Sequence, residues 1–115
     1  MLADPDDAMV EPTGIFLVAL SGQSPVGCAG LRLLAEQVGE LKRVYVRPAA
    51  RGNGLGAALI AALEAHARAR SVTRLRLDTR HELDEALRLY ERHGYQRIER
   101  YNKPGLADLW FEKVL

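Results

Sequence analysis

Three glycines alternate where a helical pattern begins, and this turn constrains the fold more than any other feature of the chain. Gly52, Gly54 and Gly56 directly precede apolar residues that recur at helical spacing. The strand-like segment 40–46 comes shortly before them. Glycine lets a backbone approach a ligand closely, and the first amides of a helix have no partner within it. Together with the positive end of the helix dipole and the charge of Arg51, these amides predict a phosphate-binding site.

Two other interpretations of the glycine-rich turn are open from the residues alone. The first is a flexible connection, in which each glycine inside the helix costs roughly 1 kcal/mol. The second is a dinucleotide site, since Gly52, Gly54 and Ala57 fit the relaxed G-x-G-x-x-G/A pattern and Asp78 ends the next strand. Residues 47–51 separate the preceding strand from the first glycine, which speaks against this second interpretation. A P-loop is excluded because no Gly-Lys-Ser/Thr follows the turn.

The apolar pattern along the chain predicts an α/β fold with more strands than helices. Period-2 alternation or short apolar runs predict strands, and 3.6-residue spacing predicts helices after Pro48 and around Tyr90. The adjacent charges of Lys42 and Arg43 break the alternation of their strand, which indicates a β-bulge or an edge position. The predicted strands are 14–20, 26–34, 40–46, 74–78, 95–101 and 109–115, after an irregular lead-in over 1–13.

The first helix is expected to bury one stripe of side chains. The stripe predicted from helical spacing consists of Leu55, Leu59, Ala62, Leu63 and His66. Glu64, Arg68 and Arg70 lie mainly off this stripe. His66 is interpreted as a satisfied core residue, and Cys28 as a small buried hydrophobic residue.

Composition narrows the class of protein without identifying its chemistry. A chain of 115 residues is most simply one domain, and sixteen basic against fifteen acidic residues give a net charge of +1. This balance predicts no nucleic-acid partner and no membrane surface. The single cysteine cannot form an internal disulfide, and no cluster has metal-ligand spacing, so we expect a reducing, cytoplasmic location and no metal. The start of the chain lacks the pattern of a signal peptide, and its apolar runs are too short to cross a bilayer.

Three motifs carry a resemblance to one family of enzymes. Residues 51–56, RGNGLG, resemble the Q/R-x-x-G-x-G/A pyrophosphate motif of the GCN5-related N-acetyltransferases (GNAT family). Residues 40–48 resemble the fourth strand of that family, and 86–95 are similar to the A-x-x-L-Y-x-x-x-G-F/Y signature of its fourth helix. The motifs occur in the family's order, and the resemblance covers about residues 14–115. It implies a mixed, mostly antiparallel sheet with helices packed on it, the acyl-CoA N-acyltransferase fold.

The resemblance also implies a reaction and a co-substrate. The family transfers an acetyl group directly from acetyl-CoA to an amine, so the expected acceptor is a primary amine of a small molecule or peptide. The backbone of the fourth strand would bind the pantetheine, and the amides of the glycine-rich turn would bind the pyrophosphate. The cofactor-binding residues implied in this way are Val44, Tyr45, Val46, Arg51, Gly52, Asn53, Gly54, Leu55, Gly56 and Ala57, within a core spanning about residues 39–95.

The resemblance further suggests two catalytic side chains. Tyr90 occupies the Leu-Tyr position of the fourth helix and is the candidate acid for the leaving thiolate. Its alternative interpretation is a core aromatic residue, because it lies on the apolar stripe of the helix. Glu40 is the candidate base, acting through water, and its alternative is a solvated strand end. The backbone amide of Val44 is a candidate to polarise the thioester carbonyl.

Two departures from the family pattern leave alternative functions and a dimeric assembly open. Leu83 occupies a position where many members have an asparagine that contacts the cofactor. About thirteen residues precede the first predicted strand, where the family usually has a strand and one or two helices, so the acceptor side is expected to be shortened. The alternatives are a non-catalytic acyl-CoA-binding module or truncated domain, and a homodimer in which a partner chain completes the site. The apolar segment Trp110–Leu115 suits strand pairing within or between chains.

Overall fold

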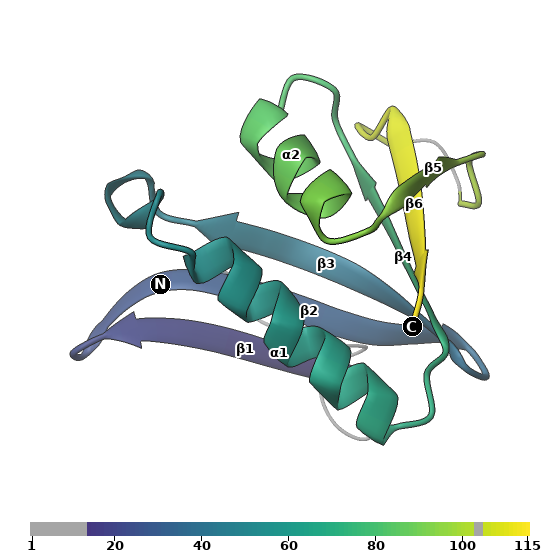
Figure 1. Ribbon diagram of the computed structural model, residues 1–115, viewed down its shortest axis with the longest axis horizontal. Coiled ribbons are helices and arrows are strands. Elements are labelled where there is room, and N and C mark those ends of the chain that lie inside the picture. Colours follow the sequence, from purple (N-terminus) through teal and green to yellow (C-terminus); the bar gives the residue numbers. More distant parts are fainter. Residues whose placement is uncertain (1–13, 103–104) are drawn as a thin grey trace.

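Six strands form one mixed sheet in the computed structural model, which describes residues 14–102 and 105–115 (Figure 1). Neighbouring strands are antiparallel except for β3 and β4, and the order across the sheet is β1-β2-β3-β4-β6-β5. The elements are β1 (Gly14–Ser21), β2 (Ser24–Ala35), β3 (Val38–Val46), the 3-10 turn η2 (Pro48–Ala50), α1 (Leu55–Ala69), β4 (Arg74–Thr79), α2 (Asp84–Arg92), β5 (Gln96–Ile98) and β6 (Leu109–Val114).

The predicted order of strands and helices and the mostly antiparallel sheet are therefore confirmed. The strand expected over 95–101 is shorter than predicted, since only Gln96–Ile98 pairs with β6. The lead-in expected over 1–13 lies outside the described residues. Within the part of the chain that is described, no helix has the length and apolar character needed to cross a bilayer.

The two parallel strands, β3 and β4, pair over a short stretch only. Val38 to Glu40 lie opposite Arg74 to Arg76, and beyond Glu40 the register between the two strands ends. Each strand keeps its other neighbour, because β3 pairs with β2 and β4 pairs with β6. The sheet therefore divides into two halves that diverge from the end of this pairing, and Figure 1 shows the separation between β3 and β4.

A β-bulge in β3 accompanies this divergence. Cys28 of β2 lies opposite Tyr45, and Gly30 lies opposite Lys42, so β3 has one extra residue between the paired positions. Arg43 adopts a positive φ of 55° at the bulge, and its carbonyl accepts a hydrogen bond from the Cys28 thiol at 3.2 Å. The bulge predicted from the adjacent charges is confirmed, and the edge position is wrong because β3 lies inside the sheet.

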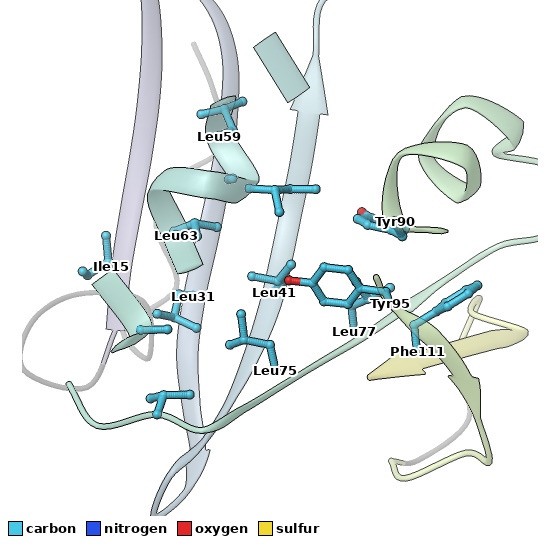
Figure 2. Packing of buried hydrophobic residues seen from close by; sticks show 14 residues of the cluster. Ile15, Leu31, Leu41, Leu59, Leu63, Leu75, Leu77, Tyr90, Tyr95 and Phe111 are labelled. Atoms are coloured by element: carbon cyan, nitrogen blue, oxygen red, sulfur yellow. The ribbon is translucent and has the colours of Figure 1, made fainter. Parts of the chain in front are cut away.

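The core lies between one face of the sheet and the two helices. Alternate residues of β4, Leu75 and Leu77, are completely buried there, and Leu31 of β2 lies beside them (Figure 2). The helices meet at their edges, since a Cβ on Gly56 of α1 would lie 2.9 Å from a Leu89 methyl group of α2. Glycine at this position therefore permits close packing of the two helices.

The buried stripe of α1 differs from the predicted one. The buried residues of this helix are Leu59, Ile60, Leu63, Glu64 and Ala67. His66 is exposed, so its interpretation as a core residue is wrong, whereas Cys28 is buried as expected. Leu59 and Leu63 belong to both stripes, and the helix is rotated so that Ile60 and Ala67 face the sheet.

A polar network explains why Glu64 can be buried. Its carboxylate accepts a hydrogen bond from the Tyr95 hydroxyl at 2.9 Å and pairs with the Lys113 ammonium at 3.0 Å. The network joins α1 to β6, and the Lys113 ammonium also lies 5.6 Å from the centre of the Tyr95 ring. Glu64 therefore belongs to the buried side of α1 although the sequence placed it mainly off the stripe, because two partners distant in sequence satisfy its charge.

The terminal strand pairs within the chain. β6 lies between β4 and β5, so both of its hydrogen-bonding edges are occupied by strands of the same molecule. The pairing of this segment within the chain, one of the two possibilities that the sequence left open, is therefore confirmed. Only β1 and β5 form the edges of the described sheet.

Candidate active site

A cleft of about 480 Å³ opens where β3 and β4 diverge. This volume falls in the range of small-molecule sites, roughly 300–1,000 Å³. One wall is the bulged part of β3, the other is the end of β4 with α2, and a third group of residues comes from the segment before β6. The lining residues are 41–44, 78–80, Leu83, Ala86, Tyr90 and 105–107.

The glycine-rich turn has the geometry expected of an anion site. Gly52 and Gly54 have φ values of 83° and 78°, and a Cβ on either would meet nothing within 4 Å. The first intrahelical bond runs from the Ala58 amide to the Gly54 carbonyl at 3.0 Å. The amides at residues 55–57 therefore have no acceptor within the helix, as expected for its first turn. Only Gly56 of the three glycines lies inside the helix.

Arg51 contacts the end of β3, although its side chain is 43% exposed. Its Nε donates to the Val46 carbonyl at 2.9 Å, and its guanidinium lies 5.9 Å from the centre of the Tyr45 ring. A Glu85 carboxylate oxygen lies 3.9 Å from Arg51 Nε, and the Asn53 amide group reaches the Ala50 carbonyl at 3.5 Å. The structure thus brings the turn and the end of β3 together.

Tyr90 is a core aromatic residue, as one of its two interpretations predicts, and its catalytic role stays a prediction. Only 5% of the residue is exposed, and its ring packs against Tyr95 and Phe111 with ring centres 6.0 and 6.3 Å apart (Figure 2). It also lines the cleft. Burial, with a smaller contribution from the charge of Asp78, raises the pKa of Tyr90 to about 12. The phenol therefore keeps its proton at neutral pH.

Glu40 is completely buried at the point where the two parallel strands separate. Its carboxylate accepts from Arg32 Nε at 2.8 Å and from the Tyr101 hydroxyl at 2.5 Å, and the Lys42 ammonium lies 3.7 Å away. The interpretation of Glu40 as a solvated strand end is therefore wrong. Burial and the hydrogen bond to Glu40 raise the pKa of Tyr101, whose ring also lies under the Arg76 guanidinium.

A second carboxylate, Asp78, reaches the cleft and was considered from sequence only as a ribose ligand. Its Oδ2 accepts from the Asn102 amide at 2.5 Å, and Asn102 in turn accepts from the Trp110 indole at 2.8 Å. Asp78 stands at the end of a central parallel strand, where polar residues often bind ligands. That position was the signal for the site, but nothing local indicated Asn102 or Trp110.

Two further observations complete the site. Leu83, which replaces the family's asparagine, is 42% exposed at the start of α2 and lines the cleft. Among residues 14–102 and 105–115, no group of three or more His, Cys, Asp or Glu residues is placed to hold a metal ion.

A mixed sheet whose two parallel strands diverge beside a glycine-rich helix start is the fold of the acyl-CoA N-acyltransferases. A protein of Klebsiella pneumoniae subsp. pneumoniae assigned to that class has a solved structure with a TM-score of 0.82 and 42% sequence identity, covering 96% of this chain and 79% of its own. The sequence model of the acetyltransferase (GNAT) family matches residues 2–95. The chain belongs to this family.

Two other relatives extend the comparison. The IAA acetyltransferase of Azospirillum brasilense is 34% identical over 110 residues, which are 93% of this chain and 72% of that protein. The PaiA N-acetyltransferase of Thermoplasma acidophilum, solved in complex with coenzyme A, has a TM-score of 0.78 at 20% identity over 90% of this chain and 62% of its own. At that identity the second likeness shows the fold alone.

Proposed function

We propose that this protein is an acetyl-CoA-dependent N-acetyltransferase that acts on a primary amine of a small molecule or peptide. The observation that carries the proposal is the divergence of β3 and β4 beyond Glu40, which opens a cleft lined by Tyr90. Membership of the acetyltransferase family and the coenzyme A complex of a structural relative support it.

The residues of the glycine-rich turn suit the diphosphate of coenzyme A. The free amides at residues 55–57 and the open space beside Gly52 and Gly54 provide donors without a steric barrier. Arg51 donates one N–H to the Val46 carbonyl and retains four others for phosphate oxygens. The Val46 carbonyl has a second lone pair, so it can also accept from a pantetheine amide.

Acetyl-CoA would supply an activated acetyl thioester, whose carbonyl carbon forms a bond to the amine nitrogen as its bond to sulfur breaks. We propose that the Val44 amide donates to the carbonyl oxygen as negative charge develops there. Tyr90 would donate its proton to the departing sulfur. Because an ordinary thiol has a pKa of about 8.5, this transfer is favourable only if the sulfur anion is also desolvated in the cleft.

Glu40 stays our proposed base, acting through water. Its burial beside Arg32 and Tyr101 stabilises the carboxylate without solvent, and a water in the cleft would connect it to the amine. An ammonium group loses two protons during the reaction, and both leave through Glu40 and water, because the sulfur takes its proton from Tyr90; one proton is released overall. The Tyr90 phenol then recovers its proton from solvent.

Thiol release from acetyl-CoA in the presence of alkylamines, amino acids and short peptides tests the reaction, with calorimetry of coenzyme A binding in parallel. Tyr90→Phe should lower kcat by about 10²- to 10⁴-fold and leave binding intact. Arg51→Ala should weaken coenzyme A binding about tenfold, whereas Arg97→Ala, which removes the same charge on β5, should not. No thiol release above hydrolysis with any acceptor, while binding is intact, would contradict the enzymatic proposal.

The second candidate function is a non-catalytic acyl-CoA-binding module. Leu83 favours it, since an apolar side chain stands at the start of α2 where the family has a polar cofactor contact. This candidate predicts saturable binding of coenzyme A and acetyl-CoA with no turnover.

Three broader expectations are carried forward as proposals. We propose one domain with its cofactor-binding core over about residues 39–95, and a cytoplasmic location that rests on the single cysteine. A homodimer would have to form away from β6, because that strand is paired on both edges. Val18 and Leu20 on the edge strand β1 are 45% and 60% exposed, so β1 is the proposed contact. A monomeric mass by light scattering would exclude the dimer.

A further inference from the structure

Asp78 approaches the cleft from the side of the sheet opposite the helices. Its neighbours in β4, Leu77 and Thr79, are buried under the helices, and successive side chains of a strand point to opposite faces. Asp78 is half-buried and lines the cleft. Tyr90 reaches the same cleft from α2, on the helix side. The gap between β3 and β4 therefore has a phenol on one side and a carboxylate on the other.

Side-chain hydrogen bonds fix the orientation of Asp78. An indole N–H can only donate, so the contact with Trp110 assigns the oxygen of Asn102 to the indole and its NH₂ group to Asp78. This NH₂ group then holds Asp78 Oδ2 at 2.5 Å. Within residues 14–102 and 105–115 no hydrogen bond engages the other carboxylate oxygen, Oδ1, which can therefore accept from a ligand.

Two of the cations that line the cleft, Lys42 and Arg80, face carboxylates other than Asp78. Within the described residues, the Lys42 ammonium faces Glu40 at 3.7 Å and the Arg80 guanidinium faces Glu82 at 3.2 Å. No Lys, Arg or His side chain of that part of the chain forms an ion pair with Asp78. The negative charge of Asp78 acts on two neighbouring phenols, because it contributes to raising the pKa values of Tyr90 and Tyr101.

We propose that Asp78 binds the ammonium group of the acceptor, so that the acceptor enters the cleft as a cation. The proposal rests on the proposed function and deepens it by naming the residue that selects amines over neutral acceptors. An amine held at Asp78 lies on the opposite side of the gap from Tyr90, so nitrogen attack and sulfur departure take place on different sides of the thioester. Asp78 is thus a binding and positioning residue.

Asp78→Asn is the variant that tests this role. An asparagine oxygen can still accept the hydrogen bond from Asn102, so the variant keeps the shape of the cleft and loses only the negative charge. Loss of a charge-assisted hydrogen bond should raise KM for amine acceptors about 10- to 100-fold, with the dissociation constant for acetyl-CoA within about twofold of wild type. Glu91→Gln, which removes an exposed charge from α2, is the control and should change neither constant. An unchanged KM in Asp78→Asn would overturn the proposal.

A binding experiment separates this proposal from the proposed function. Titration of n-butylamine into the coenzyme A complex, followed by NMR, reports ammonium binding without turnover, and 1-butanol is the neutral probe of the same size. We expect the wild-type protein to bind the amine more tightly than the alcohol and Asp78→Asn to lose that preference. If no acetyl transfer occurs but the preference is observed, the proposed function fails and the role of Asp78 stands. Equal binding of both probes to the wild type would overturn the role of Asp78.

Discussion

Tyr90→Phe should change how the stability of the protein depends on alkaline pH. Burial raises the pKa of this phenol from 10.0 to about 12, so between these values the unfolded chain ionises while the folded protein stays neutral. The stabilisation from the neutral phenol is fully present below pH 10 and is lost as pH rises through the folded pKa. The loss is about 1.4 kcal/mol at about pH 11 and about 3 kcal/mol above the folded pKa, since one unit corresponds to about 1.4 kcal/mol.

Urea unfolding of the wild type and the variant, in parallel from about pH 8 to pH 11, measures this effect. At the lower end the two free energies of unfolding should agree within about 1 kcal/mol, because phenylalanine keeps the ring contacts with Tyr95 and Phe111. Toward pH 11 the wild type should lose about 1.4 kcal/mol relative to the variant. A difference that does not change with pH would show that the Tyr90 hydroxyl is solvated in the folded protein, and the argument for a buried proton donor would fail.

Further predictions concern other parts of the fold. Glu64→Gln should lower the free energy of unfolding by about 2–3 kcal/mol, because it leaves the partly buried Lys113 ammonium without its counter-charge; a loss below about 0.5 kcal/mol would contradict this account. Gly54→Ala should cost about 1 kcal/mol in the same assay, since φ is 78° there, and no change would show that the turn relaxes. Burial raises the pKa of the Cys28 thiol, so Ellman's reagent should label the folded protein much more slowly than the protein in concentrated urea; equal rates would contradict its burial.

Local patterns were sufficient to predict the order of the elements and the glycine-rich turn at the start of α1. The β-bulge could be expected because Lys42 and Arg43 cannot both follow the alternation of one strand. The glycine-rich turn could be expected because its glycines themselves permit the backbone conformation of the turn. The orientation of α1 could not be predicted to the same degree. Glu64 and His66 both lie beside Leu59 and Leu63, which belong to the predicted and to the observed stripe. Which of the two polar residues is buried depends on Lys113, which is 49 residues away from Glu64 in the chain.

The acceptor side of the candidate site was harder to predict for the same reason. Asp78 was visible as an acid at the end of a strand, but its orientation depends on Asn102, 24 residues further along. The burial of Glu40 likewise depends on Tyr101, which lies 61 residues away. Both partners belong to a segment without a repeating pattern, so sequence periodicity carries no information about their contacts.

The described residues of the segment between β5 and β6 contact the rest of the molecule mainly through three side chains. Tyr101, Asn102 and Asp108 contact β3, β4 and the connection after β4 respectively, and one backbone bond runs from the Asp108 amide to Thr79. Residues 105–107 form one wall of the cleft, whereas the glycine-rich turn lies at the start of α1. Substitutions at 105–107 would therefore reshape that wall while the turn keeps its geometry.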